Sequence, residues 1–291
     1  MRPWENFSLM VVLGLLAGLA TGGPPAEYAG EVSTAAMVFA MTFSLTEVRL
    51  LGLSVREESR WFLRALVLNY GALSGLILVL ALFNTDPAIR YGWIVMAAVP
   101  SAIAVIPITS LFRGNVQRAL VSSALLYLAA LGLAPLVTLV FAGGAASPVD
   151  LGIQLLLQIA IPLAVSQALA RVGAVARHRR TLVNLSFFAL VLTLTGANRS
   201  VLVGSPTLVA ALAVGAFVRT WGIGAVVYAI SRRASSDRAT HVADALFSSL
   251  KNLGFAAVLG VSLFGAPAAL PAIVSIFLEI SWVVALGSRF P

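Results

Sequence analysis

Long apolar segments alternate with short polar connections along the whole chain. A helix needs about 20 apolar residues to cross a bilayer, and on that length the pattern predicts ten membrane helices. No connection is long enough for a separate soluble domain. We interpret the first segment as a membrane helix rather than a cleaved signal peptide. The predicted helices span approximately residues 7–22, 32–45, 61–83, 91–112, 119–142, 151–169, 181–197, 207–230, 239–264 and 267–286.

The predicted helices form two sets of five in corresponding order. Those that begin near positions 7, 61 and 119 have counterparts near positions 151, 207 and 267. Because five crossings are an odd number, the second set begins on the opposite side of the membrane and inserts upside down. Such inverted repeats are common in alternating-access transporters. The sequence therefore predicts an all-α membrane protein with a first repeat at 1–146 and a second, inverted repeat at 147–291.

Composition supports the bilayer as the surrounding solvent and excludes other classes. The chain is 60% hydrophobic and only 10% charged, with a mean hydropathy of +0.99. The net charge of +8 comes from basic residues dispersed between long apolar runs, so we expect no nucleic-acid partner. No cysteine and two histidines predict neither a metal site nor a cofactor. No set of nucleophile, base and orienting residue suggests an enzyme.

The arginines indicate how the chain is oriented, because basic residues near helix ends stay on the cytoplasmic side. Placing the amino terminus and the even-numbered connections on one side leaves only Arg90 and Arg199 opposite. We therefore expect an inner-membrane protein with both termini in the cytoplasm. The arginines on the predicted cytoplasmic side are Arg2, Arg49, Arg56, Arg60, Arg64, Arg113, Arg118, Arg171, Arg177, Arg179, Arg180, Arg232, Arg233, Arg238 and Arg289.

The fourth helix of each set carries a matching interruption. Pro100 and Pro107 lie within the fourth predicted helix, and the polar run Ser-Ser-Leu-Lys-Asn-Leu-Gly at 248–254 lies within the ninth. Proline removes a backbone donor and clashes with the preceding turn. Irregular backbone at membrane depth is tolerated only where it is buried in protein or lines a wet cavity. The paired positions favour a binding site over two unrelated packing kinks.

Lys251 is the only lysine in the chain, and it lies in the ninth interruption. An ammonium at the bilayer centre costs at least about 2.5–3.5 kcal/mol on insertion scales, so it needs a partner or a role. Lysine, unlike arginine, can gain and lose a proton when buried. A purely structural alternative is a fixed ion pair with Asp244 or with Glu279.

Other polar residues lie on predicted membrane helices. Glu279 should face the protein interior, whereas Asp244 and Arg219 lie nearer helix ends and are expected to extend to the membrane surface. Each of the remaining polar residues is, singly, typical of an interhelical hydrogen bond; they are Asn69, Thr109, Ser122 and Ser123.

Three segments resemble the bile acid:sodium symporter family, including its bacterial homologues. They are Phe-Ala-Met-Thr-Phe-Ser-Leu-Thr at 39–46, Leu-Phe-Arg-Gly-Asn at 111–115 and Lys-Asn-Leu-Gly-Phe-Ala-Ala at 251–257. The resemblance implies a prokaryotic transporter of ten helices arranged in a panel domain and a core domain. It also implies that helices 4 and 9 are unwound and crossed where substrate and ions bind.

The sequence departs from the family at the positions that bind sodium. By resemblance, Phe247 replaces a glutamate and Lys251 a glutamine of the ninth helix, and Val105 and Ile106 replace polar residues of the fourth. The hydroxyl positions of the fifth helix correspond to Ala119 and Ser123, and Asn69 stands where the third helix would supply a glutamine. Most oxygen ligands of sodium are therefore missing.

We hypothesise that the Lys251 ammonium takes the place of a sodium ion in a transporter of a small organic anion. A lysine that stays charged would make a facilitator, and one that titrates would couple transport to protons. An anionic substrate is expected because Lys251 and the helix amino termini after the interruptions are electropositive. The candidate substrate-binding or coupling residues are Lys251, Asn252, Ser248, Ser249, Gly254, Glu279, Pro107, Thr109, Asn69 and Ser123.

Two alternatives stay open. An auxin-efflux-like carrier shares the crossed-helix fold and works without sodium, but that family generally has proline at both crossings, and this chain has none at 250–254. A membrane sensor of the same fold, which binds without transporting, is the second alternative.

Overall fold

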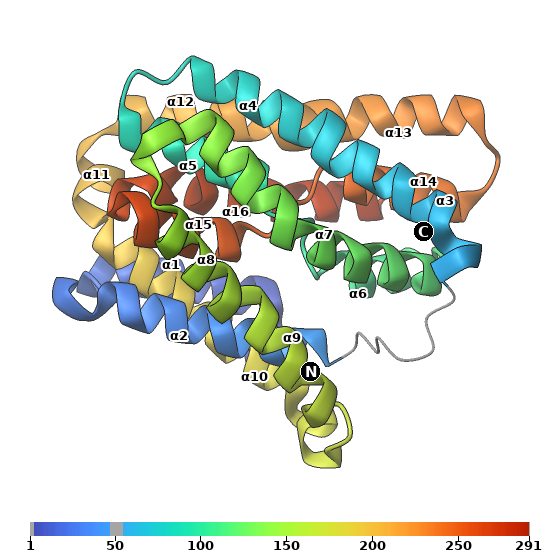
Figure 1. The fold of residues 1–291 in the computed structure, drawn as a ribbon, viewed down its shortest axis with the longest axis horizontal. Coiled ribbons are helices and arrows are strands. Elements are labelled where there is room, and N and C mark those ends of the chain that lie inside the picture. Colours follow the sequence, from blue (N-terminus) through green and yellow to red (C-terminus); the bar gives the residue numbers. More distant parts are fainter. Residues whose placement is uncertain (1–2, 47–54, 291) are drawn as a thin grey trace.

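The computed structural model describes residues 3–46 and 55–290, and these residues form helices without a strand (Figure 1). Arg2 and Arg49, which contribute to the predicted orientation, lie outside the described residues, as does the side chain of Arg56. The first half contains α1 (Phe7–Thr21), α2 (Ala26–Leu45), α3 (Val55–Leu66), α4 (Ser74–Leu82), α5 (Pro87–Ala98), α6 (Val105–Leu111) and α7 (Val116–Ala142). The second contains α8 (Pro148–Leu155), α9 (Ile161–Leu169), α10 (Gly173–Ala197), α11 (Arg199–Gly204), α12 (Pro206–Phe217), α13 (Ile223–Ala234), α14 (Arg238–Phe247), α15 (Leu253–Phe264) and α16 (Leu270–Gly287).

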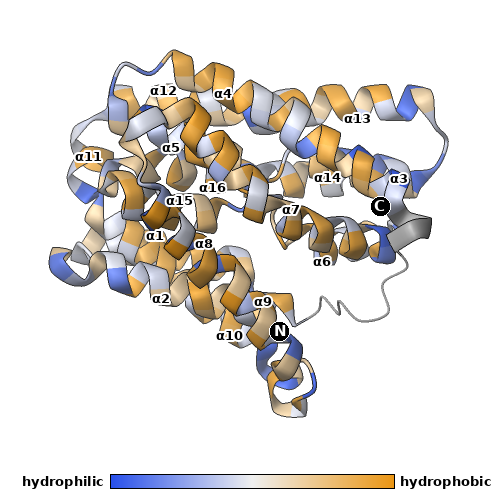
Figure 2. Cartoon of the chain, in the orientation of Figure 1, coloured by the Kyte–Doolittle hydropathy of each residue, from blue (hydrophilic) through white to orange (hydrophobic). Residues whose placement is uncertain are grey.

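Among the described residues, six helices are long and apolar enough to cross a membrane, judged by length and composition. Two shorter apolar helices, Phe7–Thr21 and Leu253–Phe264, accompany them. Hydrophobic residues run along the outward faces of these helices (Figure 2), as the bilayer requires of an integral membrane protein. The six are Ser59–Leu82, Val116–Ala145, Pro148–Leu169, Gly173–Ala197, Pro206–Ala234 and Ala266–Gly287.

Helices α1, α2, α9 and α10 pack together on one side of the molecule (Figure 1). Helix α10 contacts both α1 and α2, and α9 contacts α2. Glycine allows α1 and α10 to approach closely: a Cβ at Gly18 would lie 2.6 Å from the carbonyl oxygen of Leu192. Small residues at such positions let membrane helices pack backbone to backbone. The remaining long helices form a second group, in which α5 contacts α4, α7, α15 and α16.

Three membrane helices contain a stretch of π-helix. The stretch Val67–Leu73 joins α3 to α4, Leu156–Ala160 joins α8 to α9, and Val218–Gly222 joins α12 to α13. A π-helical turn re-aims side chains and is often found at functional sites. The first of these stretches carries Asn69, and the third carries Arg219.

Two helices are broken within the second group. The chain leaves helical geometry at 99–104, between α5 and α6, and again at 248–252, between α14 and α15. Pro100 lies in the first break, where no helical hydrogen bond is required of its nitrogen. Pro107 differs from our expectation, because it lies inside α6 rather than interrupting a helix. It occupies the first turn, where the backbone N–H has no intrahelical partner to lose.

Candidate functional site

The two breaks meet in the middle of the second helix group. The backbone N–H of Asn252 donates a hydrogen bond of 2.9 Å to the carbonyl oxygen of Pro100. The side-chain oxygen of Asn252 accepts from the backbone N–H of Phe255 and so caps α15. Its amide nitrogen donates to the Tyr127 hydroxyl at 2.6 Å. Asn252 thus fixes the break at the start of α15 and ties it to α7 and to the break before α6.

The Lys251 ammonium is fully buried and surrounded by oxygen atoms. Its Nζ also lies 4.5 Å from the centre of the Tyr70 ring, a favourable position for a cation. Two of the oxygens belong to side chains of the membrane helix Ser59–Leu82, and two are carbonyl oxygens at the end of α5. They are Asn69 Oδ1 at 3.0 Å, Ser74 Oγ at 2.8 Å, Ala97 O at 3.2 Å and Val99 O at 2.8 Å.

The orientation of Asn69 and Ser74 makes this shell accept hydrogen bonds from the ammonium. The Asn69 amide nitrogen donates to the carbonyl oxygens of Phe247 and Leu250, at 3.0 and 3.2 Å, which leaves Oδ1 facing the amine. The Ser74 hydroxyl donates to the carbonyl oxygen of Ala97 at 2.6 Å or of Asn69 at 3.0 Å, and accepts from Lys251. The alternative of a fixed ion pair between the Lys251 amine and Asp244 or Glu279 does not hold among the described residues, because the amine contacts neutral oxygens.

Glu279 contacts the same break through the backbone. Its Oε1 accepts hydrogen bonds from Arg219 Nη2 at 2.7 Å and from the backbone N–H of Lys251 at 3.0 Å. Arg219 is fully buried, whereas the Glu279 side chain keeps 12% of its exposure. The expectation that Arg219 reaches the membrane surface is therefore wrong. The Glu279 carboxylate supplies the counter-charge of the Arg219 guanidinium inside the protein. A buried guanidinium without this partner would lower the stability of the fold.

Asp244 is also buried rather than at the surface, contrary to our expectation. Both of its oxygens pair with the guanidinium of Arg64, with Nε and Nη2 each at 2.6 Å. The Ser231 hydroxyl donates to the same carboxylate. This fork-shaped pairing joins α3 to α14 and holds the half of the broken helix that precedes Lys251.

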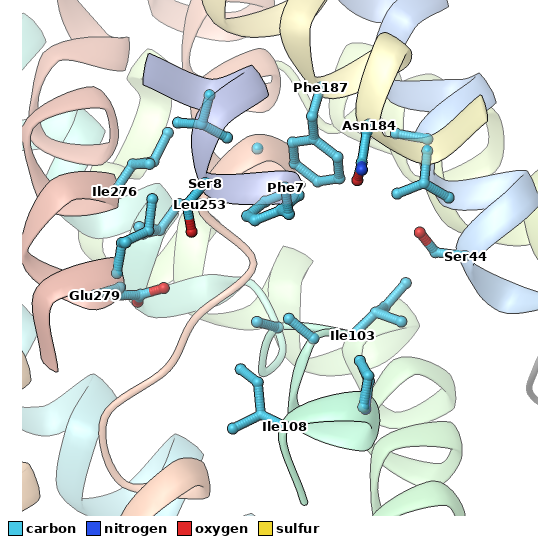
Figure 3. A pocket seen from close by; sticks show the side chains of 18 of the residues that line it. Phe7, Ser8, Ser44, Ile103, Ile108, Asn184, Phe187, Leu253, Ile276 and Glu279 are labelled. Carbon is cyan, nitrogen blue, oxygen red and sulfur yellow. The ribbon is translucent and has the colours of Figure 1, made fainter. Parts of the chain in front are cut away.

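A cavity of about 490 Å³ lies between the two helix groups. Its wall is largely apolar, with Glu279 extending toward the open space from α16 and Ser8, Ser44 and Asn184 on α1, α2 and α10 (Figure 3). The polar and charged residues that line it are Asn6, Ser8, Ser44, Arg179, Arg180, Asn184, Lys251, Asn252 and Glu279. Such a cavity, apolar with a few convergent polar groups, is typical of a small-molecule site.

The candidate residues divide between the cavity and its support. Five of them line the cavity: Pro107, Lys251, Asn252, Gly254 and Glu279. The other candidates are buried behind it. Ser248 and Ser249 donate to the carbonyl oxygen of Ala245, and Thr109 to that of Val105; Ser123 has no partner in the described part of the chain, and Asn69 holds the Lys251 amine.

Several residues of the site are absent from our sequence-based candidates. Ser74 begins the otherwise apolar helix α4, five residues after Asn69, and this spacing is its only signal. Tyr127 is a single phenol on α7, and Arg179 and Arg180 belong to a basic run that we read only as an orientation signal.

Three of the positions that, by the resemblance, replace oxygen ligands of sodium are packed with apolar side chains. Phe247, Val105 and Ala119 belong to one buried hydrophobic cluster, and each is at most 2% exposed. Because these side chains carry no oxygen and fill the space, they offer a cation neither ligands nor room.

Comparison with known families agrees with this architecture. No curated protein matches the chain. A family model described as the Sodium Bile acid symporter family matches residues 34–204, from within α2 to the end of α11. The matched residues make up more than half of the chain. This integral membrane protein, with its two broken helices, its buried ammonium and its cavity, therefore belongs to the sodium bile acid symporter family.

Proposed function

We propose that this family member is a secondary transporter that carries a small organic anion by alternating access and does so without sodium. The observation that carries the proposal is the shell of four oxygens around the Lys251 ammonium. A metal ion bound in the same place would likewise be a buried cation held only by neutral oxygens. In this chain the cation is covalently attached and cannot leave with the substrate.

The apolar packing around Phe247 supports the same proposal. With the Lys251 ammonium among the oxygen atoms and apolar side chains at Phe247, Val105 and Ala119, sodium has no site in this proposal. The cavity beside the meeting breaks is the substrate site in this proposal. Its Arg179 and Arg180 attract an anionic group, and its apolar walls accept the body of an amphipathic acid.

We further propose ten membrane crossings in two inverted repeats, 1–146 and 147–291. The breaks at 99–104 and 248–252 fall in corresponding helices of the two halves, as do the π-helical stretches Val67–Leu73 and Val218–Gly222. Arg179 and Arg180 line the cavity and belong to the side that charge assigns to the cytoplasm. On this orientation, in the inner membrane with both termini inside, the structure is the inward-facing state.

Uptake into proteoliposomes tests the function. The probes are phenylacetate, camphor-10-sulfonate and taurocholate, each with one anionic group on an apolar body but of different size. Sodium and pH gradients are imposed separately, and protein-free liposomes correct for leak. We expect uptake of at least one probe that does not change when choline replaces sodium. Sodium-driven accumulation would overturn the proposal, and saturable binding without flux would favour a membrane sensor of this fold.

A further inference from the structure

The carboxylate of Glu279 has one oxygen engaged and one available. Oε1 accepts from Arg219 and from the backbone N–H of Lys251, whereas Oε2 makes no hydrogen bond with the residues that the structure describes. The side chain lines the cavity and extends from α16 toward the open space (Figure 3). A substrate in the cavity therefore meets Oε2.

The Lys251 amine cannot readily exchange its proton where it lies. Asn69 Oδ1 and the carbonyl oxygens of Ala97 and Val99 only accept hydrogen bonds, and the Ser74 hydroxyl spends its hydrogen on a carbonyl oxygen. A neutral amine would direct its lone pair at these acceptors. The site therefore favours the ammonium, and Lys251 acts as a fixed charge.

The other ionisable groups near Glu279 are also fixed. Arg219 contacts it from the π-helical stretch Val218–Gly222, and Arg179 and Arg180 line the same cavity from α10. His178, also on α10, is exposed and does not line the cavity. Arginine stays protonated in proteins. Of the other helices packed on α16, α12, α15 and the 3-10 stretch Ala266–Ala269 contain no charged residue, and α5 contains only Arg90, which is exposed. Among the described residues that line the cavity, Glu279 alone can take up and release a proton.

We propose that Glu279 binds one proton whenever the cavity binds an organic anion, so that anion and proton cross the membrane together. This inference rests on the proposed transport function and adds its coupling ion. The empty site holds the cations Arg219 and Lys251 and the anion Glu279. An entering anion would face a like charge on Glu279, and two like charges sharing a site retain a proton.

The net charge of the site stays the same when the anion and the proton bind together. A proton from the solution bonds to Oε2 of Glu279, which becomes neutral and donates that proton in a hydrogen bond to the anionic group of the substrate. Oε1 of Glu279 still accepts hydrogen bonds from Arg219 Nη2 and from the backbone N–H of Lys251. The substrate replaces the charge that Glu279 loses, so the net charge of the site is unchanged between its empty and loaded states. After reorientation the anion leaves, and the proton leaves Oε2 to the opposite solution.

The test uses camphor-10-sulfonate and taurocholate, because sulfonates stay ionised and carry no proton through the lipid themselves. Wild-type proteoliposomes loaded with a pH indicator should show proton movement with either anion, at one proton per anion. A potassium potential set with valinomycin should leave the rate unchanged within about two-fold, because no net charge moves. A pH gradient should drive accumulation.

Glu279→Gln keeps an oxygen for Arg219 and for the Lys251 N–H but cannot take up a proton. We expect this variant to lose pH-driven accumulation while it still exchanges labelled for unlabelled anion across the membrane. Glu31→Gln, which neutralises an exposed carboxylate on α2, is the matched control and should behave as wild type. Size-exclusion profiles and thermal unfolding establish that each variant is folded.

The outcomes separate the two proposals. Anion flux without proton movement in the wild type, or pH-driven accumulation retained in Glu279→Gln, overturns the role of Glu279 and leaves the transport function standing. Flux of neither anion in the wild type overturns this inference, and the transport function falls with it if phenylacetate is not taken up either. Loss of exchange together with accumulation in a folded Glu279→Gln protein also contradicts the inference, because a binding role would then account for the defect.

Discussion

Replacing Lys251 should change how the protein responds to sodium. Lys251→Met removes the charge and leaves a side chain of similar length in a fully buried site. Asn69 Oδ1 and the Val99 carbonyl oxygen would then lose their only hydrogen-bond donor within the described part of the structure. At about 1–3 kcal/mol for each orphaned acceptor, the loss is roughly 2–6 kcal/mol of stability. Ala97 O keeps its bond from Ser74.

Lys251→Gln, compared with Lys251→Met, tests whether sodium can bind in place of the ammonium. Its amide is shorter than the lysine side chain, so the vacated space beside Asn69, Ser74, Ala97 and Val99 has room for a cation and retains oxygen ligands. If sodium binds there, it stabilises the fold by about 2.7 kcal/mol at one hundred times its dissociation constant. We therefore expect sodium to recover much of the stability that the substitution removes.

Thermal unfolding in detergent checks this prediction. The three proteins are measured in sodium chloride and in choline chloride at equal ionic strength. We expect wild type to be indifferent to sodium, Lys251→Gln to be stabilised by it, and Lys251→Met to be destabilised in both salts. Stabilisation of the wild type by sodium, or an equal response of the two variants, would refute the reasoning that the amine occupies a cation site.

Two further predictions concern packing and charge. Arg219→Met leaves the Glu279 carboxylate without its counter-charge and should cost about 3–5 kcal/mol. The double variant Arg219→Met with Glu279→Gln should unfold at a higher temperature than the single Arg219 variant, and the reverse order would contradict the pairing. Gly18→Ala places a Cβ 2.6 Å from a carbonyl oxygen of α10 and should destabilise by about 1–3 kcal/mol in thermal unfolding. Gly30→Ala, whose Cβ meets no atom within 4 Å, is its control and should be neutral or slightly stabilising.

The sequence alone determines the class of protein and the place of the irregular backbone. Long apolar runs require a bilayer, because a chain that is only 10% charged cannot cover a soluble surface. The polar run at 248–254 coincides with a break in the structure at 248–252. Proline was a less reliable signal: Pro100 lies in a break, whereas Pro107 fits the first turn of α6. A proline breaks a helix only where its nitrogen would otherwise donate a hydrogen bond.

The sequence also gives the family and identifies Lys251 as unusual, because an ammonium in a membrane helix requires compensation whatever its neighbours are. It does not show which groups stabilise the charge of this ammonium. The expectation that Arg219 and Asp244 reach the membrane surface was wrong, and the ion pair that stayed open as an alternative for Lys251 is not what its amine makes with the described residues. Charge and helical spacing show which face of a helix is polar, but they do not show which other helix lies against that face.

Only the tertiary structure decides those partners. The Lys251 amine meets Asn69, which is 182 positions away in the chain; Asp244 meets Arg64 across 180 positions; and Glu279 meets Arg219 across 60. Such pairs form because helices distant in sequence pack together around the two breaks. The energy of each buried charge depends on that packing, because within the bilayer no water is available to replace a missing partner.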